Sequence, residues 1–279
     1  MTTPSKSWFI TGTSSGFGRA MTEKLLARGD RVAATLRKSG ALDDLKAQYG
    51  DRLWIAALDV TDGNAVRAVV DRAFAEVGRI DVVVSNAGYG LFGTGEEVSD
   101  AQIRHQIDTN LIGSIALIRA ALPHLRAQGG GRIVQVSSEG GQIAYPSFGL
   151  YHATKWGIEG FIEAVAQEVA PFGIGFTIAE PGPSKTDFGK GLVRAREMQV
   201  YDATPAGELR RAVAAGAFVL TGDAGKMAQA MIDSAEVSPA PRRLVMGASS
   251  YAAIRAALVQ RIAELDAQKQ VAFSTDSDD

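Results

Sequence analysis

Tyr151 and Lys155 are the two residues of this sequence whose types and spacing most directly suggest chemistry. They stand four residues apart at the start of a segment with helical period, so their side chains lie on one face and reach the same small volume. A tyrosine, with an ordinary pKa of about 10, is a poor proton-transfer group near neutral pH, but a neighbouring cation favours the phenolate. The pair therefore predicts proton transfer at a substrate oxygen, with Lys155 lowering the pKa of Tyr151.

Ser138 and Asn110 are two further polar residues at positions suited to such a site. Ser138 ends an apolar run that predicts a strand, thirteen positions before Tyr151, and its hydroxyl can hold a substrate oxygen. Asn110 interrupts a helical segment, where its amide can bridge a water to Lys155 and extend a proton path. Taken singly, each of the four residues is explained by helix packing or local hydrogen bonding. Their combination predicts a catalytic tetrad.

The elements that must position these residues form an alternating series. Short apolar runs alternate with longer segments of helical period, which is the pattern of βαβ units around a parallel sheet. The predicted strands are Trp8–Thr11, Val32–Leu36, Leu53–Leu58, Val82–Ser85, Ile133–Ser137, Gly175–Ala179 and Leu244–Met246. The predicted helices are Gly18–Arg28, Leu42–Tyr49, Asp62–Val77, Asp100–Arg126, Leu150–Ala170 and Asp223–Ala235. The sequence thus predicts an α/β fold, a doubly wound Rossmann-type parallel sheet with helices on both faces.

A glycine-rich segment follows the first predicted strand directly and leads into the first predicted helix. It places Gly12, Gly16 and Gly18 where a tight turn brings the backbone close to a phosphate. The spacing differs from the standard G-x-G-x-x-G, and standing alone it would equally fit an ordinary turn before a helix. Its position at the start of a βα series predicts a dinucleotide-binding loop.

The end of the second predicted strand bears on which dinucleotide would bind. An acid at this place would accept the 2′-hydroxyl of the adenosine ribose, but none is present, and Arg37 offers a planar fork suited to a phosphate. We therefore expect NADP(H) in preference to NAD(H), which remains the alternative. Asp59 and Val60, which close the third predicted strand, are placed to meet the adenine edge, although an acid is also favoured there because the next helix begins.

Composition limits the other classes of function. A chain of 279 residues with 46% hydrophobic content predicts one domain over residues 1–273, with an insertion near 187–222 and a flexible acidic tail at 274–279. The 29 Lys and Arg and 31 Asp and Glu are scattered, so neither nucleic acid nor a membrane is an expected partner. The chain has no cysteine, and its three histidines lack metal-ligand spacing, so no metal site is predicted. The polar N-terminus and the absence of a long apolar segment lead us to expect a soluble cytoplasmic protein.

The motifs, taken in order, resemble those of the classical short-chain dehydrogenases/reductases. They are the glycine segment from Thr11 to Gly18, Asn86-Ala87-Gly88, Asn110, Ser138 and Tyr151-x-x-x-Lys155, extended by Pro181-Gly182 and Thr186. The match covers roughly residues 5–250. Several independent motifs in the correct order are far less probable by chance than any one of them.

The resemblance implies a role for each matching residue. Gly12, Ser15, Gly16, Phe17 and Gly18 would hold the pyrophosphate, Ser14 and Arg37 would face the ribose phosphate, and Asn86, Ala87 and Gly88 would support the sheet beside the cofactor. Pro181, Gly182 and Ser184 would also bind the cofactor, and Thr186 would contact the nicotinamide amide. Tyr151 would be the general acid/base, Lys155 its pKa-lowering partner and a ligand of the nicotinamide ribose, Ser138 the clamp on the substrate oxygen and Asn110 a member of the proton relay.

The expected reaction is therefore hydride transfer between NADP(H) and a carbonyl or secondary alcohol. Aromatic residues around the tetrad, with Tyr145 and Phe188 foremost, suit a largely apolar small-molecule substrate, although such residues equally fit core packing. A non-catalytic NADP(H)-binding redox sensor is the alternative function, and an isomerase or dehalogenase on the same fold is a third. By resemblance, the apolar helices around 111–125 and 156–169 would pair across a two-fold axis in a homodimer or homotetramer. The insertion, from its length and mixed composition, is expected to close over the substrate.

Overall fold

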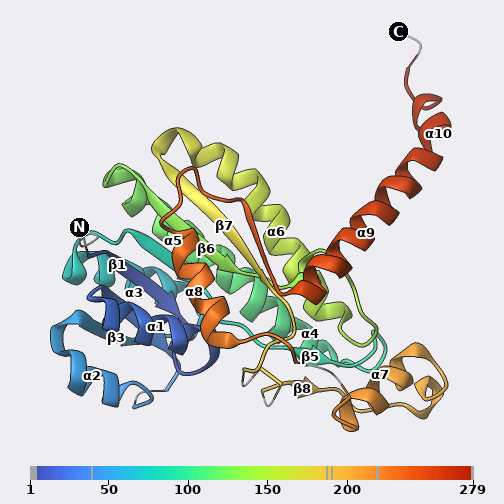
Figure 1. Ribbon diagram of the computed structural model, residues 1–279, viewed down its shortest axis with the longest axis horizontal. Helices are drawn as coiled ribbons and strands as arrows, with labels where there is room; N and C mark the ends of the chain where they lie inside the picture. The colour runs from blue at the N-terminus through green and yellow to red at the C-terminus, as the bar shows by residue number, and fades with distance from the viewer. Residues whose placement is uncertain (1–4, 39, 187, 190, 218–219, 278–279) are drawn as a thin grey trace.

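A single sheet of seven parallel strands runs through the molecule (Figure 1). The computed structural model describes residues 5–38, 40–186, 188–189, 191–217 and 220–277. In spatial order the strands are β3 (Leu53–Ala57), β2 (Arg31–Leu36), β1 (Ser7–Thr11), β4 (Val82–Ser85), β6 (Gly131–Val136), β7 (Ile174–Pro181) and β9 (Arg243–Met246). Each strand predicted from an apolar run overlaps one of these seven, and the predicted doubly wound α/β fold is confirmed.

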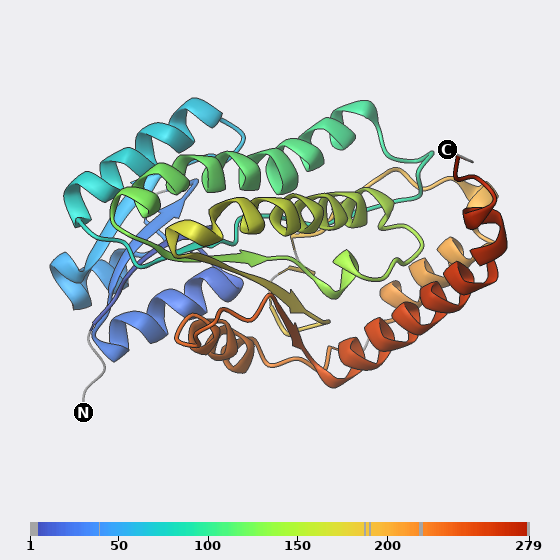
Figure 2. The same cartoon turned by 90° about the horizontal axis from the view of Figure 1, so that it is seen from above.

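Helices cover both faces of this sheet, which forms the middle of three layers (Figure 2). One face carries α3 (Gly63–Val77), α5 (Gly113–Ala127) and α6 (Gly149–Val169), and the other carries α1 (Gly16–Arg28) and α8 (Ala224–Ser234). The remaining helices are α2 (Asp43–Tyr49), α4 (Asp100–Ile107), α7 (Pro205–Ala214), α9 (Ala248–Ala267) and α10 (Lys269–Phe273). Because both faces are covered, the strands are mostly apolar rather than alternating between apolar and polar residues, and all four residues of β4 are buried.

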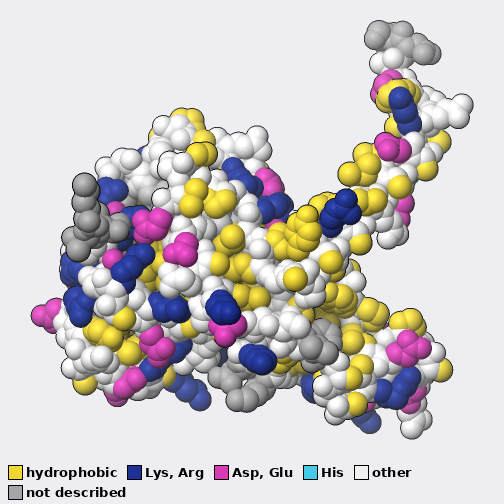
Figure 3. Space-filling view, in the orientation of Figure 1, with side chains coloured by type: hydrophobic (Ala, Val, Ile, Leu, Met, Phe, Trp, Pro, Cys, Tyr) yellow, Lys and Arg dark blue, Asp and Glu magenta, His cyan; other side chains and the backbone are white. Residues whose placement is uncertain are grey.

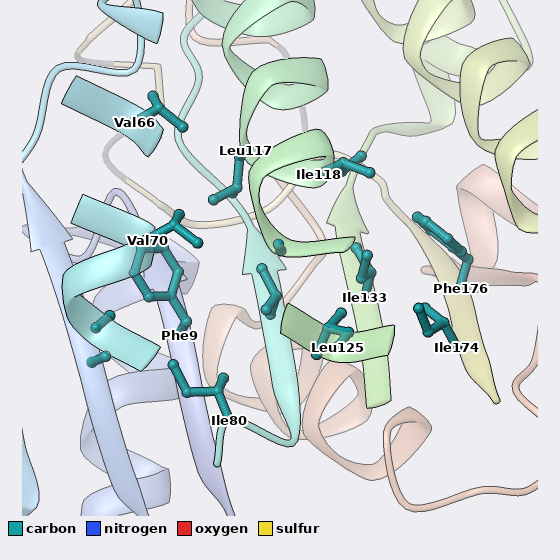
Figure 4. Close-up of a cluster of buried hydrophobic side chains, with 14 of the residues drawn as sticks. Phe9, Val66, Val70, Ile80, Leu117, Ile118, Leu125, Ile133, Ile174 and Phe176 are labelled. Atoms are coloured by element: carbon teal, nitrogen blue, oxygen red, sulfur yellow. The ribbon is translucent and has the colours of Figure 1, made fainter. Parts of the chain in front are cut away.

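The two faces of the sheet belong to two apolar cores. Along β1, Phe9 points to the core under α3, α5 and α6, while Trp8 and Ile10 point to the opposite core. In the first core, Phe9 and Ile133 from the sheet pack with Leu117 of α5 (Figure 4). Burial of this kind on both sides fixes the strand ends, and with them the loops that follow at the carboxyl edge of the sheet.

The helix predicted over 100–126 is not continuous. α4 ends at Ile107, a single π-helical turn spans Asp108–Ile112, and α5 begins at Gly113. Asn110 lies at the centre of the π turn. Such turns widen the backbone hydrogen-bond spacing locally and occur frequently at functional sites.

Two features of the chain have no counterpart among the predicted elements. α9 and α10 project from the body at the C-terminal end (Figure 1). Two short strands, β5 (Leu91–Phe92) and β8 (Val193–Arg194), pair in parallel and attach the predicted insertion to the body. Strands of two residues carry no periodicity that a sequence could display. Residues 187, 190, 218 and 219 of the predicted insertion, and 278 and 279 of the predicted tail, lie outside the described residues.

Candidate active site

Tyr151 lies in the first turn of α6, at the carboxyl edge of the sheet, and is 9% exposed. Ser138 follows β6, and its side chain lies close enough to Tyr151 to lower the pKa of the phenol. Burial has the larger effect and the negative charge of Glu139 acts with it, so the pKa of Tyr151 is raised to about 12. Tyr151 is therefore a neutral phenol near neutral pH, able to donate a proton.

Lys155 lies one turn further along α6 and is 6% exposed. Its Nζ donates a hydrogen bond of 3.0 Å to the carbonyl of Val136 and lies 5.5 Å from the centre of the Tyr151 ring. Burial lowers the pKa of Lys155 to about 8, while the carboxylate of Glu159 raises it. Burial is the largest effect on the pKa of both residues, raising that of Tyr151 and lowering that of Lys155.

Asn110 is 1% exposed and holds the loop after β4. Its Nδ2 donates to the carbonyl of Tyr89 at 2.8 Å, and its Oδ1 accepts from the backbone N–H of Tyr89 at 3.0 Å. Nδ2 also lies 3.5 Å from the hydroxyl of Thr154 on α6. A Cβ added at Gly88 would lie 3.2 Å from Oδ1 of Asn110, so a glycine there leaves room for this amide. The amide of Asn110 is thus fully engaged with the chain.

The segment that follows Ser138 is held by side chains that lie around Tyr151. The Ser138 hydroxyl accepts a bond of 3.0 Å from the N–H of Gly140, and the hydroxyl of Tyr145 donates to the buried carboxylate of Glu139 at 2.7 Å. Nε2 of His152 accepts a hydrogen bond of 2.9 Å from the N–H of Tyr145. The ring hydrogen is therefore on Nδ1, which donates to the carbonyl of Gly140 at 2.9 Å. Burial and Glu139 raise the pKa of Tyr145, and burial lowers the pKa of His152.

A buried charge network lies behind the tetrad. The hydroxyl of Ser137 donates to Glu159 at 2.5 Å, and the side chain of Gln142 donates to the same carboxylate at 2.8 Å. Arg243 of β9 bonds Glu159 at 2.6 Å and Glu180 of β7 at 2.5 Å. Burial and the charge of Glu159 raise the pKa of Glu180 despite Arg243. The network joins β6, α6, β7 and β9 beneath the tetrad.

The glycine loop brings its backbone to the surface at the start of α1. Gly12 and Gly16 have φ of +71° and +56°, which side chains other than glycine rarely adopt. A Cβ at Gly18 would lie 2.3 Å from the carbonyl oxygen of Gly12, so the helix can approach the loop only with glycine there. Ser14 and Ser15 are exposed, and Ser15 makes no side-chain cap on α1. The free N–H groups of this turn suit a phosphate.

Asn86 and Ala87 tie β4 to this loop. Nδ2 of Asn86 donates to the carbonyls of Thr11 at 2.9 Å and Gly12 at 3.1 Å. The Thr11 hydroxyl accepts from the N–H groups of Asn86 at 3.0 Å and Ala87 at 3.1 Å. These bonds join the ends of two neighbouring strands and fix the loop between them.

Arg37 and Asp59 lie at the ends of neighbouring strands β2 and β3. The Asp59 carboxylate accepts from the N–H and hydroxyl of Thr61, which lower its pKa, and the positive charge of Arg37 lowers it further. Arg37 itself is exposed just past β2. Val60 packs against α5, where its carbonyl oxygen lies 2.8 Å from a Cβ added at Gly113. Its side chain thus belongs to the fold as well as to the predicted adenine edge.

The segment after β7 runs across the opening of the glycine loop. Pro181 ends β7, and the N–H of Gly182 donates to the carbonyl of Met246 at 2.9 Å. Ser184 forms an isolated bridge with Gly222. A Cβ at Gly16 would lie 4.0 Å from the Cβ of Thr186, so this threonine faces the loop.

Phe188 continues this segment to the tetrad, although its side chain is 41% exposed. Its ring lies edge-on to that of Tyr151, with centres 5.6 Å apart. Phe148 lies on the same tyrosine at 6.2 Å. Aromatic carbon thus borders the ring of Tyr151 on two sides.

Two further classes of site were sought in the described part of the chain. There, no group of three or more His, Cys, Asp or Glu side chains is placed to hold a metal ion. No helix within the described ranges combines the length and apolar character needed to cross a membrane.

Comparison with known proteins decides the family. The family model of the short chain dehydrogenases matches residues 6–197. The chain belongs to the short-chain dehydrogenase/reductase family. Oxidoreductase BOA17 of Botryotinia fuckeliana is 43% identical over 71% of this chain and 73% of that protein. Human 17-beta-hydroxysteroid dehydrogenase type 1 is 34% identical over 70% of this chain and 61% of its own length. A solved short-chain dehydrogenase from Streptomyces avermitilis is 39% identical, with a TM-score of 0.91 over 98% of this chain and all of its own.

As a member of this family, the chain is an oxidoreductase whose site holds residues beyond the predicted set. Glu139, His152 and Glu159 are buried around the tetrad and were missed by sequence reasoning. Glu159 could have been found, because it repeats the spacing of four that links Tyr151 to Lys155. Glu139 and His152 carry no such signal, since their positions depend on the path of the loop between β6 and α6.

Proposed function

We propose that this protein is an NADP(H)-dependent oxidoreductase that interconverts a largely apolar ketone and the corresponding secondary alcohol. The observation that carries the proposal is that the side chains of Ser138 and Tyr151 lie next to one another, beside the buried Lys155. Two neighbouring hydroxyls can hold one carbonyl oxygen, and one of them is a neutral phenol that can donate its proton.

The residues at the carboxyl edge fit a nicotinamide dinucleotide. Backbone N–H groups free at the start of α1 and glycines at positive φ make a cradle that side chains would fill. In the proposal, Gly12, Ser15, Gly16, Phe17 and Gly18 hold the pyrophosphate, Ser14 and Arg37 the ribose phosphate, Asp59 and Val60 the adenine edge, and Lys155, Pro181, Gly182, Ser184 and Thr186 the nicotinamide end. The exposed Arg37 supports NADP(H) over NAD(H), since phosphate suits its planar fork.

The steps assigned to the protein are binding and proton transfer. When bound, NADPH would supply a hydride to the carbonyl carbon of the substrate. Ser138 and Tyr151 hold the carbonyl oxygen, and Tyr151 donates its proton to that oxygen as negative charge develops. The ammonium of Lys155, 5.5 Å from the phenol ring, stabilises the phenolate that remains. Asn110 lies at the centre of the widened helical turn and fixes the loop after β4 through its two bonds to Tyr89.

The substrate surface supports an apolar ketone. Phe148 and Phe188 border Tyr151, and the hydroxyl of Tyr145 is occupied by Glu139. The name of the human relative indicates that it acts on a steroid, a large apolar substrate of this reaction type. For this chain we propose the same chemical class, an apolar ketone or alcohol, without a particular compound.

A panel of ketones, quinones and alcohols with NADPH and NADH tests the proposal. We expect steady oxidation of NADPH with at least one apolar ketone, and loss of turnover by about a thousandfold in Tyr151→Phe with cofactor binding retained. Near-normal turnover in that variant would refute the role of Tyr151. Binding of NADPH by the wild type without turnover across the panel would favour the redox sensor instead.

The assembly we propose is a homodimer or homotetramer in which α5 and α6 pair with a second copy. Ile112, directly before α5, and Trp156, in the first half of α6, are 50% and 43% exposed. Ile112→Asp is expected to halve the mass measured by sedimentation at micromolar concentration. An unchanged mass would place the contact elsewhere.

A further inference from the structure

The C-terminal arm, defined as α9 and α10 (residues 248–273), is attached to the body only through its first half. Ser250 is fully buried and Ile254 is 6% exposed. Arg261 makes the last contact, with its guanidinium 5.0 Å from the ring centre of Trp156 and a hydrogen bond to the carbonyl of Gln142. From Ile262 onward every described residue of the arm is exposed. The second half of the arm therefore stands in solvent (Figures 1 and 3).

An apolar stripe continues along this free part. Its members follow one another at intervals of three or four residues and are Tyr251, Ile254, Leu258, Ile262 and Leu265. At 100° per residue they fall within an arc of about 80°. Ile254 buries its part of the stripe against the body, whereas Ile262 and Leu265 are 59% and 67% exposed. Yellow side chains run along the projecting arm in Figure 3.

The free part of the arm is poorly stabilised by itself. Most helical stability in proteins comes from packing, and isolated helices shorter than about 12–15 residues are marginal in water. The last turn of α9 carries Glu264 and Asp266 and no basic residue. Acidic groups at the C-terminal end of a helix oppose its dipole. The free part of the arm therefore has no apolar surface packed against its stripe. It also has no positive charge in the last turn of α9 to offset the acidic side chains.

A second copy of the same arm, running antiparallel, supplies both. Arg255 and Asp266 are eleven residues apart, which is close to three whole turns, so they lie on the same flank of the stripe. In an antiparallel pair, a two-fold axis perpendicular to both helices brings the same flank of the stripe in the two copies to the same side. Residues on that flank of one copy therefore face residues on that flank of the other. With the axis between residues 260 and 261, Arg255 of each copy faces Asp266 of the other, twice per pair, while Ile262 lies over the apolar stripe of the second copy.

The charges of the arm are better suited to pairing with a second copy of the arm than to binding an anionic lipid surface. The arm contains three basic and two acidic residues, and Arg261 is already engaged with the body. No basic face is left that would bind acidic lipid. The first turn of each α9 lies about 19 Å from the proposed axis, so the two bodies sit at opposite ends of the helix pair.

We propose that the C-terminal arms of two copies pair antiparallel through the exposed members of the stripe, with Arg255 of one copy bonded to Asp266 of the other; these members are Tyr251, Leu258, Ile262 and Leu265. This contact is separate from the proposed pairing of α5 and α6 and independent of the proposed catalytic function. The arm offers far fewer residues than the roughly 20–30 per side of a standard interface. It therefore joins assemblies that are also held elsewhere, or forms at high concentration.

Charge reversal tests the pairing in the full-length protein. Arg255→Glu and Asp266→Arg are each expected to weaken self-association at least tenfold in sedimentation experiments, because each sets like charges together. The double variant restores opposite charges and is expected to return to within about threefold of the wild type. Gln260→Glu, on the opposite face of the same helix, is the matched control and leaves the association unchanged. Single variants without effect, or a double variant no better than either single one, overturn the proposal.

Cross-linking gives a second and geometric test, because the chain has no native cysteine. In the antiparallel pair, copies of residue 262 are offset by about 4.5 Å along the helices and copies of residue 265 by about 14 Å. Ile262→Cys is therefore expected to form a disulfide between copies on oxidation, and Leu265→Cys is not. Equal cross-linking at both positions would show a parallel pair, and cross-linking at neither would show unpaired arms. Either result overturns the proposal.

Discussion

The ring of Phe188 lies edge-on to the ring of Tyr151, with 5.6 Å between their centres. Phe188 belongs to the segment after β7, whereas Tyr151 belongs to α6, so the insertion reaches the proposed proton donor. The contact depends on space left by Gly90, where an added Cβ would lie 2.6 Å from Cζ of Phe188. We infer that the insertion forms part of the substrate site beside the reacting hydroxyl.

Phe188→Ala is predicted to raise KM for an apolar ketone about tenfold while leaving KM for NADPH unchanged. The reason is loss of apolar contact with the substrate, worth about 1–2 kcal/mol for an aromatic ring that is partly exposed. Steady-state kinetics with both substrates varied provide the measurement, and Phe188→Leu, which keeps apolar volume, is the control. An equal rise in both KM values would mean that the ring supports the cofactor instead.

The rate of ketone reduction is predicted to fall as pH rises through about 8. Tyr151, with its pKa raised to about 12, stays protonated over this range. Lys155, with its pKa lowered to about 8, loses the charge that stabilises the phenolate formed during the reaction. We expect kcat/KM to decrease about tenfold per pH unit on the alkaline side. Lys155→Arg keeps its charge and should lack this limb, whereas a wild-type profile flat to pH 10 would contradict the assignment.

Glu159→Gln is predicted to move that alkaline limb to lower pH. The carboxylate of Glu159 raises the pKa of Lys155, whereas burial lowers it. Removing the negative charge of Glu159 therefore lowers the pKa of Lys155 further. The same change removes a buried ionic partner of Arg243 and should cost about 3 kcal/mol of unfolding free energy. Glu163→Gln is the matched control, because Glu163 also pairs with Arg243, at 2.8 Å, but is 44% exposed. It should cost less than about 1 kcal/mol and leave the pH profile in place.

The sequence predicted the sheet well because buried parallel strands are apolar along their whole length. The run Val82–Ser85 is one example, and all its residues are buried. The spacing of four residues between Tyr151 and Lys155 correctly placed both on one face of a helix, because this prediction depends only on the local helical period. The arm could have been predicted too, since Tyr251, Ile254 and Leu258 repeat at helical intervals.

Features that depend on distant contacts were not predictable. Arg243 meets Glu159 across 84 positions, and no local pattern joins a strand residue near the C-terminus to a helix in the middle of the chain. The pKa of Tyr151 is a second case. A cation four residues away predicted a lowered value, but burial, which depends on the packing of the whole edge, raises it.

Arg37→Ser is predicted to raise KM for NADPH by about 10–100-fold with little change in KM for NADH. Only NADPH carries the 2′-phosphate that the guanidinium can bind in a bidentate manner. Lys38→Ser, the neighbouring exposed base, is the control and should have a smaller effect. Equal KM changes for both cofactors would place Arg37 away from the ribose phosphate.

Arg210→Met is predicted to release the insertion from the body. The guanidinium of Arg210, on α7, bonds the carboxylate of Glu97, and the two side chains are 7% and 1% exposed. Burial alone would raise the pKa of Glu97, but N–H groups of Thr94 and Met198 together with Arg210 hold it below its ordinary value. Removal of the cation leaves a buried carboxylate without its partner, a cost of about 3–5 kcal/mol.

Because that cost can be avoided by local undocking of α7, the variant should show faster limited proteolysis between residues 191 and 217 and a raised KM for the ketone. Tyr201→Phe, which removes an exposed bond of 2.7 Å to Glu96 from the same segment, is the control and should change neither. If Arg210→Met instead lowers the melting temperature of the whole protein without faster cleavage in this segment, the ion pair stabilises the domain globally. The insertion would then be a fixed wall of the substrate site rather than a segment that closes over it.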